Sequence, residues 1–416
     1  MTTSARARRV RRTYIAMSAL DWFADMTLTV TSVLLLRERG LGSSAIFATI
    51  AAVWLLEALF EIPTGIAADV FGRRPAILVS LALRAVGYSA LFFSDAVEIA
   101  VAGTLVAAAG STFLSGALEA WAVDELSALD PSALDGLFTR SRIGENVGLV
   151  LGTLTGAFLG TKSLALPQFA AGAASCAGIV VVTLFVKETT RTTIAKMAFT
   201  RRVWTTSREI LGATSRLVRT ERILVGLVIT SALLWTLRGI PGVQWSAHFE
   251  SLATNNLLVL GLMRCASSLA EIPLLMLLDR VRERHGTWRK NIIVLATAIG
   301  GALLFVSSRA QSPLLSIIAY VGFTVSTGLC MPSIRAAMNE RIGAAHRATA
   351  LSCAAFFGNT FTGIGLLLVG AHVAKLEDVS VTWPIAGVGF VLVGLVAASL
   401  ATKRSAAPAA LEAAAE

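Results

Sequence analysis

Apolar runs of about 20 residues recur along most of the chain, and each is long enough to cross the ~30 Å hydrocarbon core of a bilayer as a helix. The chain is 55% hydrophobic and only 15% charged, so a soluble globule could not cover its surface with polar groups. We therefore expect an all-α membrane protein with twelve transmembrane helices, at 14–36, 43–66, 75–94, 96–120, 141–161, 164–186, 223–246, 253–278, 291–308, 312–333, 349–373 and 380–401.

A basic polar stretch divides these runs into two sets of six. The predicted organisation is a basic cytosolic tail at 1–13, an N-terminal six-helix bundle at 14–186, a cytosolic linker at 187–222, a C-terminal six-helix bundle at 223–401 and a cytosolic tail at 402–416. The linker is rich in Lys and Arg, which favours contact with anionic lipid headgroups.

The net charge of +10 could indicate a nucleic-acid partner, but its distribution favours a membrane one. Lys and Arg gather in alternate short connections and in the tails, as the positive-inside rule describes, which predicts that both termini are cytosolic. The first apolar run is too long for a signal peptide and contains Asp21 and Asp25, so an uncleaved first helix is expected. We expect a monomer in the bacterial inner (plasma) membrane, with no nucleic-acid partner.

The second helix ends in the pattern G-x-x-x-D-x-x-G-R-R, formed by Gly65, Asp69, Gly72, Arg73 and Arg74. Here the chain resembles the major facilitator superfamily of secondary transporters. Glu61-Ile62-Pro63 with Asp69 also recurs 210 residues later as Glu271-Ile272-Pro273 with Asp279, and parallel six-helix repeats are the arrangement of that family. The resemblance implies the major facilitator fold, with the solute site between two pseudo-symmetric halves near the midplane of the membrane.

The same resemblance implies that this cluster is a latch and gate. Gly65 would let two helices approach closely, Asp69 would cap a neighbouring helix N-terminus, and Arg73 and Arg74 would face the cytosol. A proline–glycine break is expected at Pro63 and Gly65. The family's usual basic residue after the aspartate is missing, because Val70 stands there, and the glycines are replaced in the second half, so the latch is expected to be asymmetric.

The fifth run carries a glycine at every fourth position, which makes a smooth stripe for close helix packing. Three of these glycines also resemble the antiporter motif of the family's exporters, although Ala157 replaces its proline and Thr161 its last glycine. Packing alone is the alternative explanation. The stripe comprises Gly148, Gly152, Gly156 and Gly160, preceded by Gly144.

Four carboxylates lie inside the first two apolar runs: Asp21, Asp25, Glu57 and Glu61. A charge at the centre of a span costs at least ~2.5–3.5 kcal/mol, so such residues usually mark a path for a solute or a proton. Crowded carboxylates in a low dielectric cannot all ionise, which is the property of a proton carrier. Arg84 is the expected counter-charge. The alternative is a static buried ion-pair network.

The remaining candidates would line a solute site. Glu119 could face the inner vestibule or simply reach water, and each tryptophan could equally be an interfacial anchor. The second half is more basic than the first, which suits a solute of mixed charge. The predicted substrate-binding residues are Asp25, Glu57, Arg84, Glu119, Trp235, Arg238, Arg264, Glu271 and Asn359.

The sequence shows no pattern for enzymatic chemistry. The histidines have no metal-ligand spacing, the four cysteines lie in apolar runs, and no phosphate loop or nucleophile elbow is found, so we expect neither an enzyme nor a cofactor or metal. The predicted function is proton-coupled export of small organic compounds, such as drugs or natural products, by alternating access. The alternatives are a proton-coupled importer, a lipid flippase and a non-transporting membrane receptor.

Overall fold

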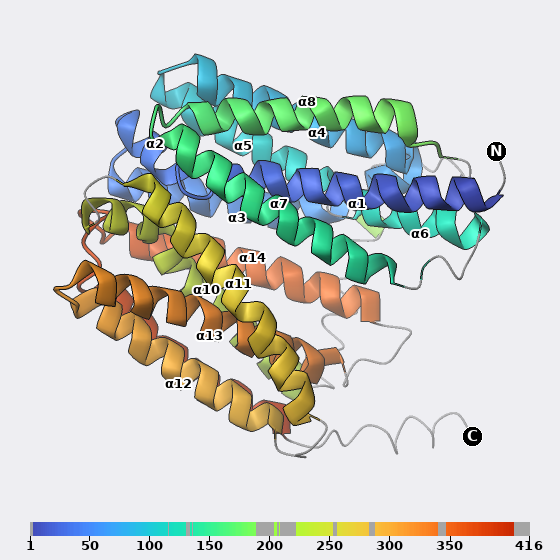
Figure 1. The fold of residues 1–416 in the computed structure, drawn as a ribbon. Helices are drawn as coiled ribbons and strands as arrows, with labels where there is room; N and C mark the ends of the chain where they lie inside the picture. Colours follow the sequence, from blue (N-terminus) through green and yellow to red (C-terminus); the bar gives the residue numbers. More distant parts are fainter. Residues whose placement is uncertain are drawn as a thin grey trace, which may run out of the picture. The chain divides into compact units, whose positions relative to one another are not determined.

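The computed structural model describes residues 3–114, 116–129, 134, 136–188, 204–205, 208, 222–252, 256–282, 288–339 and 347–402. Throughout this part of the chain the regular secondary structure is helical (Figure 1). The elements are α1 (Thr3–Leu28), α2 (Ser32–Glu38), α3 (Ser43–Phe71), α4 (Arg73–Phe93), α5 (Val97–Leu114), α6 (Ala117–Leu129), α7 (Leu137–Gly160), α8 (Leu166–Phe185), α10 (Arg222–Leu252), α11 (Leu257–Arg282), α12 (Trp288–Arg309), α13 (Pro313–Asn339), α14 (Arg347–Gly370) and α15 (Thr382–Thr402).

The predicted all-α membrane fold is confirmed, and each predicted span corresponds to one helix or to a pair. In the described residues, ten helical spans are long and apolar enough to cross a membrane, or eleven if α1 and α2, bent by 40°, form one span. The helix α14 contributes the shorter apolar stretch Ala354–Gly370. The fourth predicted span, 96–120, corresponds to α5 and α6 together, which reach Leu129.

The helix α1 begins at Thr3, so the predicted polar tail at 1–13 is largely helical. Ala and Arg, which dominate this segment, are good helix formers. Ala7, Val10, Tyr14 and Met17 recur at intervals of three or four residues and are buried in one core cluster, which includes Trp121 of α6. The tail is therefore ordered because one of its faces completes the core of the first helices.

The break expected at Pro63 and Gly65 is not made, because α3 continues through Pro63 to Phe71. A helix is the favoured backbone conformation in a membrane, because nearly every peptide N–H and C=O group forms a hydrogen bond within it. The Thr64 hydroxyl lies 2.8 Å from Phe60 O and 3.0 Å from Thr112 O of α5, which adds hydrogen bonds beside the proline. The helix ends instead at Gly72, whose φ of +110° is left-handed.

The chain divides into two compact units. The first comprises Met1–Ser207, Ser246–Cys265 and Gly370–Lys375, and the second comprises Arg208–Trp245, Ala266–Val369 and Leu376–Glu416. Within the first unit, Arg37 forms an ion pair with Glu250, and Ser43 Oγ donates to Ala374 O at 3.2 Å. The predicted linker at 187–222 and the tail at 402–416 lie largely outside the described residues.

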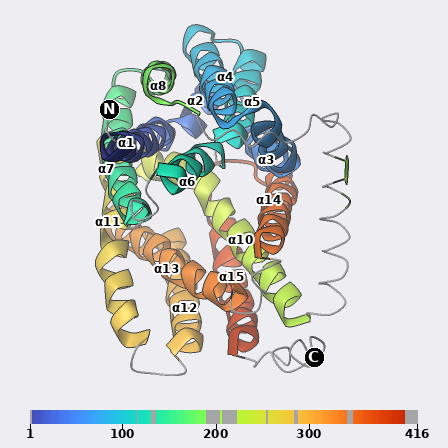
Figure 2. The same cartoon turned by 90° about the vertical axis from the view of Figure 1, so that its right-hand side faces the viewer.

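Each unit is packed around close helix contacts. In the first, α4 and α5 run side by side along their length (Figure 2). In the second, α12 and α15 meet at Gly301 and Gly387, where a Cβ on Gly387 would lie 2.7 Å from Gly301 O. Such glycines let helix backbones touch, which is how membrane helices associate without a hydrophobic driving force between them.

Candidate functional site

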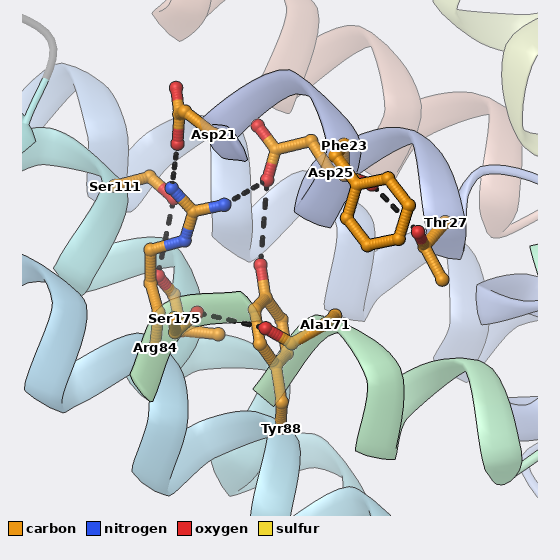
Figure 3. A network of polar contacts seen from close by, with 10 residues as sticks. Asp21, Phe23, Asp25, Thr27, Arg84, Tyr88, Ser111, Ala171 and Ser175 are labelled. Carbon is orange, nitrogen blue, oxygen red and sulfur yellow. Dashed lines mark hydrogen bonds and ion pairs between the residues drawn. The ribbon is translucent and has the colours of Figure 1, made fainter. Parts of the chain in front are cut away.

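The polar centre of the first unit joins α1 to α4. The Arg84 guanidinium lies between two carboxylates, and it donates from Nη1 to Asp21 Oδ1 and from Nη2 to Asp25 Oδ1, the latter at 2.5 Å (Figure 3). The Arg84 side chain is 2% exposed, whereas those of Asp21 and Asp25 are 26% and 44% exposed. The cation is therefore enclosed by the fold, while each carboxylate keeps an open side.

Tyr88 follows Arg84 by one turn of α4 and faces the same network (Figure 3). Its hydroxyl lies 3.5 Å from Asp25 Oδ1, and the Arg84 guanidinium carbon lies 5.9 Å from the centre of its ring. A cation near an aromatic ring is favourable, most of all away from water. Tyr88 therefore supports Arg84 and Asp25 together.

The helix α5 packs closely against Arg84, and it carries a glycine, Gly110, at the point of contact. A Cβ at Gly110 would lie 2.8 Å from Ser80 O and 2.9 Å from Arg84 Cγ, too close for any real side chain. The neighbouring hydroxyls of Ser111 and Ser175 bond to carbonyls of their own helices, α5 and α8 (Figure 3). Asp21 and Asp25 are therefore the acceptors of Arg84.

Two further carboxylates, Glu57 and Glu61 of α3, belong to the same region. Glu57 lies close enough to Asp25 and Glu61 for their charges to interact. Among the described residues, neither glutamate side chain has a hydrogen-bond or ion-pair partner. The four predicted carboxylates thus form one pair held by Arg84 and one pair without a cation of its own.

Two other polar candidates belong to the first unit, Arg264 and Glu119. Arg264 Nη2 is 4.0 Å from Met26 Sδ, next to Asp25 in the sequence. Glu119 is exposed in the first turn of α6, close enough to Tyr14 for an electrostatic interaction. Its position agrees with both predicted roles, lining a vestibule or reaching water.

The candidates of the second unit form separate groups. The Arg238 guanidinium carbon lies 5.2 Å from the centre of the Trp235 ring on α10. The Glu271 carboxyl lies directly against Gly328 of α13, where a Cβ would overlap its carbon and both oxygens. Asn359 is half-buried on α14. A network shared by Arg264 and Glu271 stays a prediction.

The predicted latch residues meet at the end of α3. Asp69 Oδ1 pairs with Arg73 Nη1 at 2.5 Å, and Arg73 Nε lies 3.8 Å from Asp124 Oδ2 of α6. One detail differs from expectation. Gly65 is exposed, and a Cβ there would meet nothing within 4 Å, so it brings no helices together here. Among the described residues Asp69 pairs with the Arg73 side chain, and its predicted cap on a neighbouring helix N-terminus stays a prediction.

The carboxylate at the N-terminus of α4 belongs to Glu188. The backbone N–H of Arg73 donates to Glu188 Oε1 at 3.0 Å, and that of Arg74 to Oε2 at 3.4 Å. This places a negative charge where the helix dipole and the free amides favour it. A Cβ at Gly72 would lie 2.7 Å from Glu188 Oε2, so the glycine of the motif also leaves space for this acid. The sequence analysis missed Glu188; its position directly after the sixth apolar run was the available signal.

The glycine stripe of α7 packs on α1. A Cβ on Gly148, Gly152 or Gly156 would run into α1, and one on Gly160 would run into Thr31, which lies between α1 and α2. Gly148 faces Ala19 O, Gly152 faces Phe23 O, Gly156 faces Thr27 O and Gly160 faces Thr31 Cγ2. The stripe thus packs closely on α1, the helix that carries Asp21 and Asp25, and a part in antiport stays a prediction.

Fold and site together define a multi-pass α-helical membrane protein with an ion-pair network inside its first bundle. The family model of the Major Facilitator Superfamily matches residues 14–366. The chain belongs to this superfamily, whose members with this fold carry small-molecule substrates.

Solved structures share the fold at low sequence identity. The nucleoside transporter NupG is 14% identical, with a TM-score of 0.77 over 95% of this chain and 100% of its own. The peptide transporter POT with sulfate is 13% identical, with a TM-score of 0.73 over 96% of this chain and 98% of its own. A D-xylose–proton symporter is 15% identical, with a TM-score of 0.69 over 94% of this chain and 97% of its own. A search of curated protein sequences found no match.

Proposed function

We propose that this transporter couples the movement of a small organic solute to protons through the carboxylates around Arg84. The observation that carries the proposal is the imbalance of charge: Asp21 and Asp25 share one enclosed guanidinium, and Glu57, near enough to Asp25 for their charges to interact, has no cation of its own among the described residues. An excess of negative charge in a low-dielectric span is costly, and binding of protons relieves it. Transport of a proton needs a group that can be charged in one state and neutral in the other.

The proposed cycle uses the open side of Asp25. When Asp25 and Glu57 bind protons, the hold of Arg84 on α1 weakens and the empty carrier resets. When they lose protons, Arg84 again binds both aspartates and the solute site regains its charge. The free energy of each step is the difference in proton affinity between the two conformations, where one pKa unit corresponds to about 1.4 kcal/mol.

We propose export as the direction of transport, with drugs or natural products as the cargo. The support is the resemblance of the α7 stripe to the exporters' motif. Uptake is the second candidate, for two reasons: packing against α1 already accounts for the stripe, and one structural neighbour is a D-xylose–proton symporter. Both directions use the same carboxylates.

Reconstitution separates these functions. A compound panel is first screened for thermal stabilisation of the purified protein, because a ligand that binds the folded state raises its Tm. Hits are then tested in proteoliposomes under an imposed pH gradient and in everted vesicles. Solute-driven proton release in everted vesicles supports export, and accumulation by intact cells supports uptake. Saturable binding without flux would overturn the proposal in favour of a receptor, and flux of a labelled phospholipid alone would favour a flippase.

The proposed orientation places both termini in the cytosol of a bacterium, with the protein acting as a monomer. Support comes from the Lys and Arg of alternate connections, which the positive-inside rule assigns to the cytosolic side. Protease protection of tags fused to the two ends would test the orientation.

A further inference from the structure

A basic groove lies between the first turns of α1 and the end of α8. Its volume is about 520 Å³, and it is open on one side. On α1 it is lined by Arg8, Arg9, Arg12 and Ala16, and on α8 by Val181 and Phe185. Arg8 or Arg9, Arg12 and Ala16 recur at intervals of three or four residues, so they occupy one face of the helix. The other face, with Ala7 and Val10, is buried in the core.

The arginines of this groove are available to a ligand. Arg8, Arg9 and Arg12 are exposed, and in the described part of the chain Arg9 and Arg12 have no hydrogen-bond or ion-pair partner. Arg8 donates only to Ser4 Oγ, at 2.7 Å. No carboxylate lines the groove among the described residues. The unbalanced positive charge therefore favours an anion.

A neighbouring cavity shows the contrast. It has a volume of about 210 Å³ and shares Arg9 and Phe185 with the groove, but Glu125 of α6 also lines it. Its cations therefore have an acid of the protein beside them. In the sequence that follows α8, no Asp or Glu occurs between Glu188 and Glu209.

The apolar side of the groove indicates which anion fits. Val181 and Phe185 lie one turn apart at the end of a membrane-spanning helix, and Phe185 is 44% exposed. Leu184 beside them is 60% exposed. The groove thus combines exposed arginines with an apolar wall at the end of a membrane-spanning helix. That combination matches a phosphate group joined to acyl chains.

We propose that this groove binds an anionic phospholipid, with its phosphate on Arg8 and Arg12 and its acyl chain along Val181 and Phe185. The site is independent of the solute pathway proposed above. It joins α1, which carries Asp21 and Asp25, to α8 in the headgroup region.

The test is a titration of the purified full chain, in neutral detergent, with dioleoyl phosphatidylglycerol and with dioleoyl phosphatidylcholine, followed by native mass spectrometry. The proposal predicts tighter binding of phosphatidylglycerol. The double variant Arg8→Gln/Arg12→Gln should weaken that binding about 30-fold, at roughly fivefold for each arginine near the membrane surface. A matched control is Arg140→Gln/Lys290→Gln, which removes two exposed cations without a partner in the described residues.

Two further arms keep the result interpretable. Soluble glycerol 3-phosphate carries the phosphate without acyl chains, and the variant Phe185→Ser removes the apolar wall while keeping every arginine. Lipid binding should weaken in Phe185→Ser, and glycerol phosphate should bind poorly to every form. Arg8→Lys/Arg12→Lys should retain most of the lipid affinity if the glutamine variant proves unstable.

Three outcomes would overturn the proposal. The first is equal affinity for the two lipids, and the second is an equal loss of phosphatidylglycerol binding in the groove and control variants. The third is binding of glycerol phosphate as tight as that of the lipid, which would make the groove a site for a soluble anion.

Discussion

Gly110 of α5 and Arg84 of α4 are in direct contact, and a Cβ on the glycine would lie 2.9 Å from Arg84 Cγ. Arg84 can reach Asp21 and Asp25 on α1 only because position 110 of α5 has no side chain. The position of the guanidinium is therefore set by a residue that carries no charge itself.

The first prediction follows from that contact. Gly110→Ala should displace Arg84 or separate α4 from α5, and overpacking of this kind typically costs ~1–3 kcal/mol. Thermal unfolding in detergent should show a lower Tm, and transport should fall. Gly116→Ala is the matched control, because a Cβ there would meet nothing within 4 Å. Equal Tm values for the two variants would contradict the contact.

The second prediction concerns Asp25. Asp25→Asn keeps the shape of the side chain but removes the charge that protons would titrate, so transport should lose its dependence on pH while the protein stays folded. Glu98→Gln removes an exposed carboxylate of α5 and should leave the dependence unchanged. The measurement is solute flux across a series of external pH values. An unaltered pH profile in Asp25→Asn would remove Asp25 from the coupling mechanism.

The third prediction tests Arg84 by stability. Arg84→Gln leaves Asp21 and Asp25 without their cation, and breaking a buried ion pair on one side typically costs ~3–5 kcal/mol. Adding Asp25→Asn to this variant removes one of the stranded charges and should restore part of the loss. The unfolding temperatures of the single and double variants measure the coupling between Arg84 and Asp25. A double variant that is as unstable as the sum of the single changes would argue against direct coupling.

The fourth prediction concerns Glu188. Glu188→Ala frees the backbone amides of Arg73 and Arg74, and loss of a helix cap costs ~0.5–2 kcal/mol. The Tm should fall, whereas Glu38→Ala, an exposed acid near the end of α2, should change it little. If Asp69 were the cap instead, Asp69→Asn would lower the Tm by as much as Glu188→Ala does.

The local features of the fold could be predicted from the sequence. Length and apolarity define a membrane helix, so the spans were found, and a carboxylate inside an apolar run is visible without coordinates. Contacts between distant positions could not be predicted in this way. Glu188 lies 115 residues from Arg73, and nothing local relates the two. The role of Gly110 could not be predicted either, because a glycine's neighbours are unknown until helices are packed.

Two expectations about α3 were wrong for a related reason. Pro63 and Gly65 are helix breakers in water, and their pairing indicated a break. In a membrane the loss of backbone hydrogen bonds is more costly than the distortion at proline, so α3 continues. Gly65 was also expected to allow two helices to pack closely. The sequence of one helix does not reveal which of its faces a neighbouring helix covers. Gly65 faces open space, while Gly148, Gly152 and Gly156 of α7 face backbone.

That difference between glycines supplies the fifth prediction. Gly152→Ala would force a Cβ against Phe23 O and should separate α7 from α1, with a loss of ~1–3 kcal/mol. Gly65→Ala has open space and should keep the Tm of the natural protein, although both glycines lie within membrane helices. Thermal unfolding measures the packing role, and solute flux at the same temperature measures transport. A Gly152→Ala protein with normal Tm but no export would assign the stripe to the transport step, whereas a lowered Tm with flux reduced in both directions would assign it to the packing of α1.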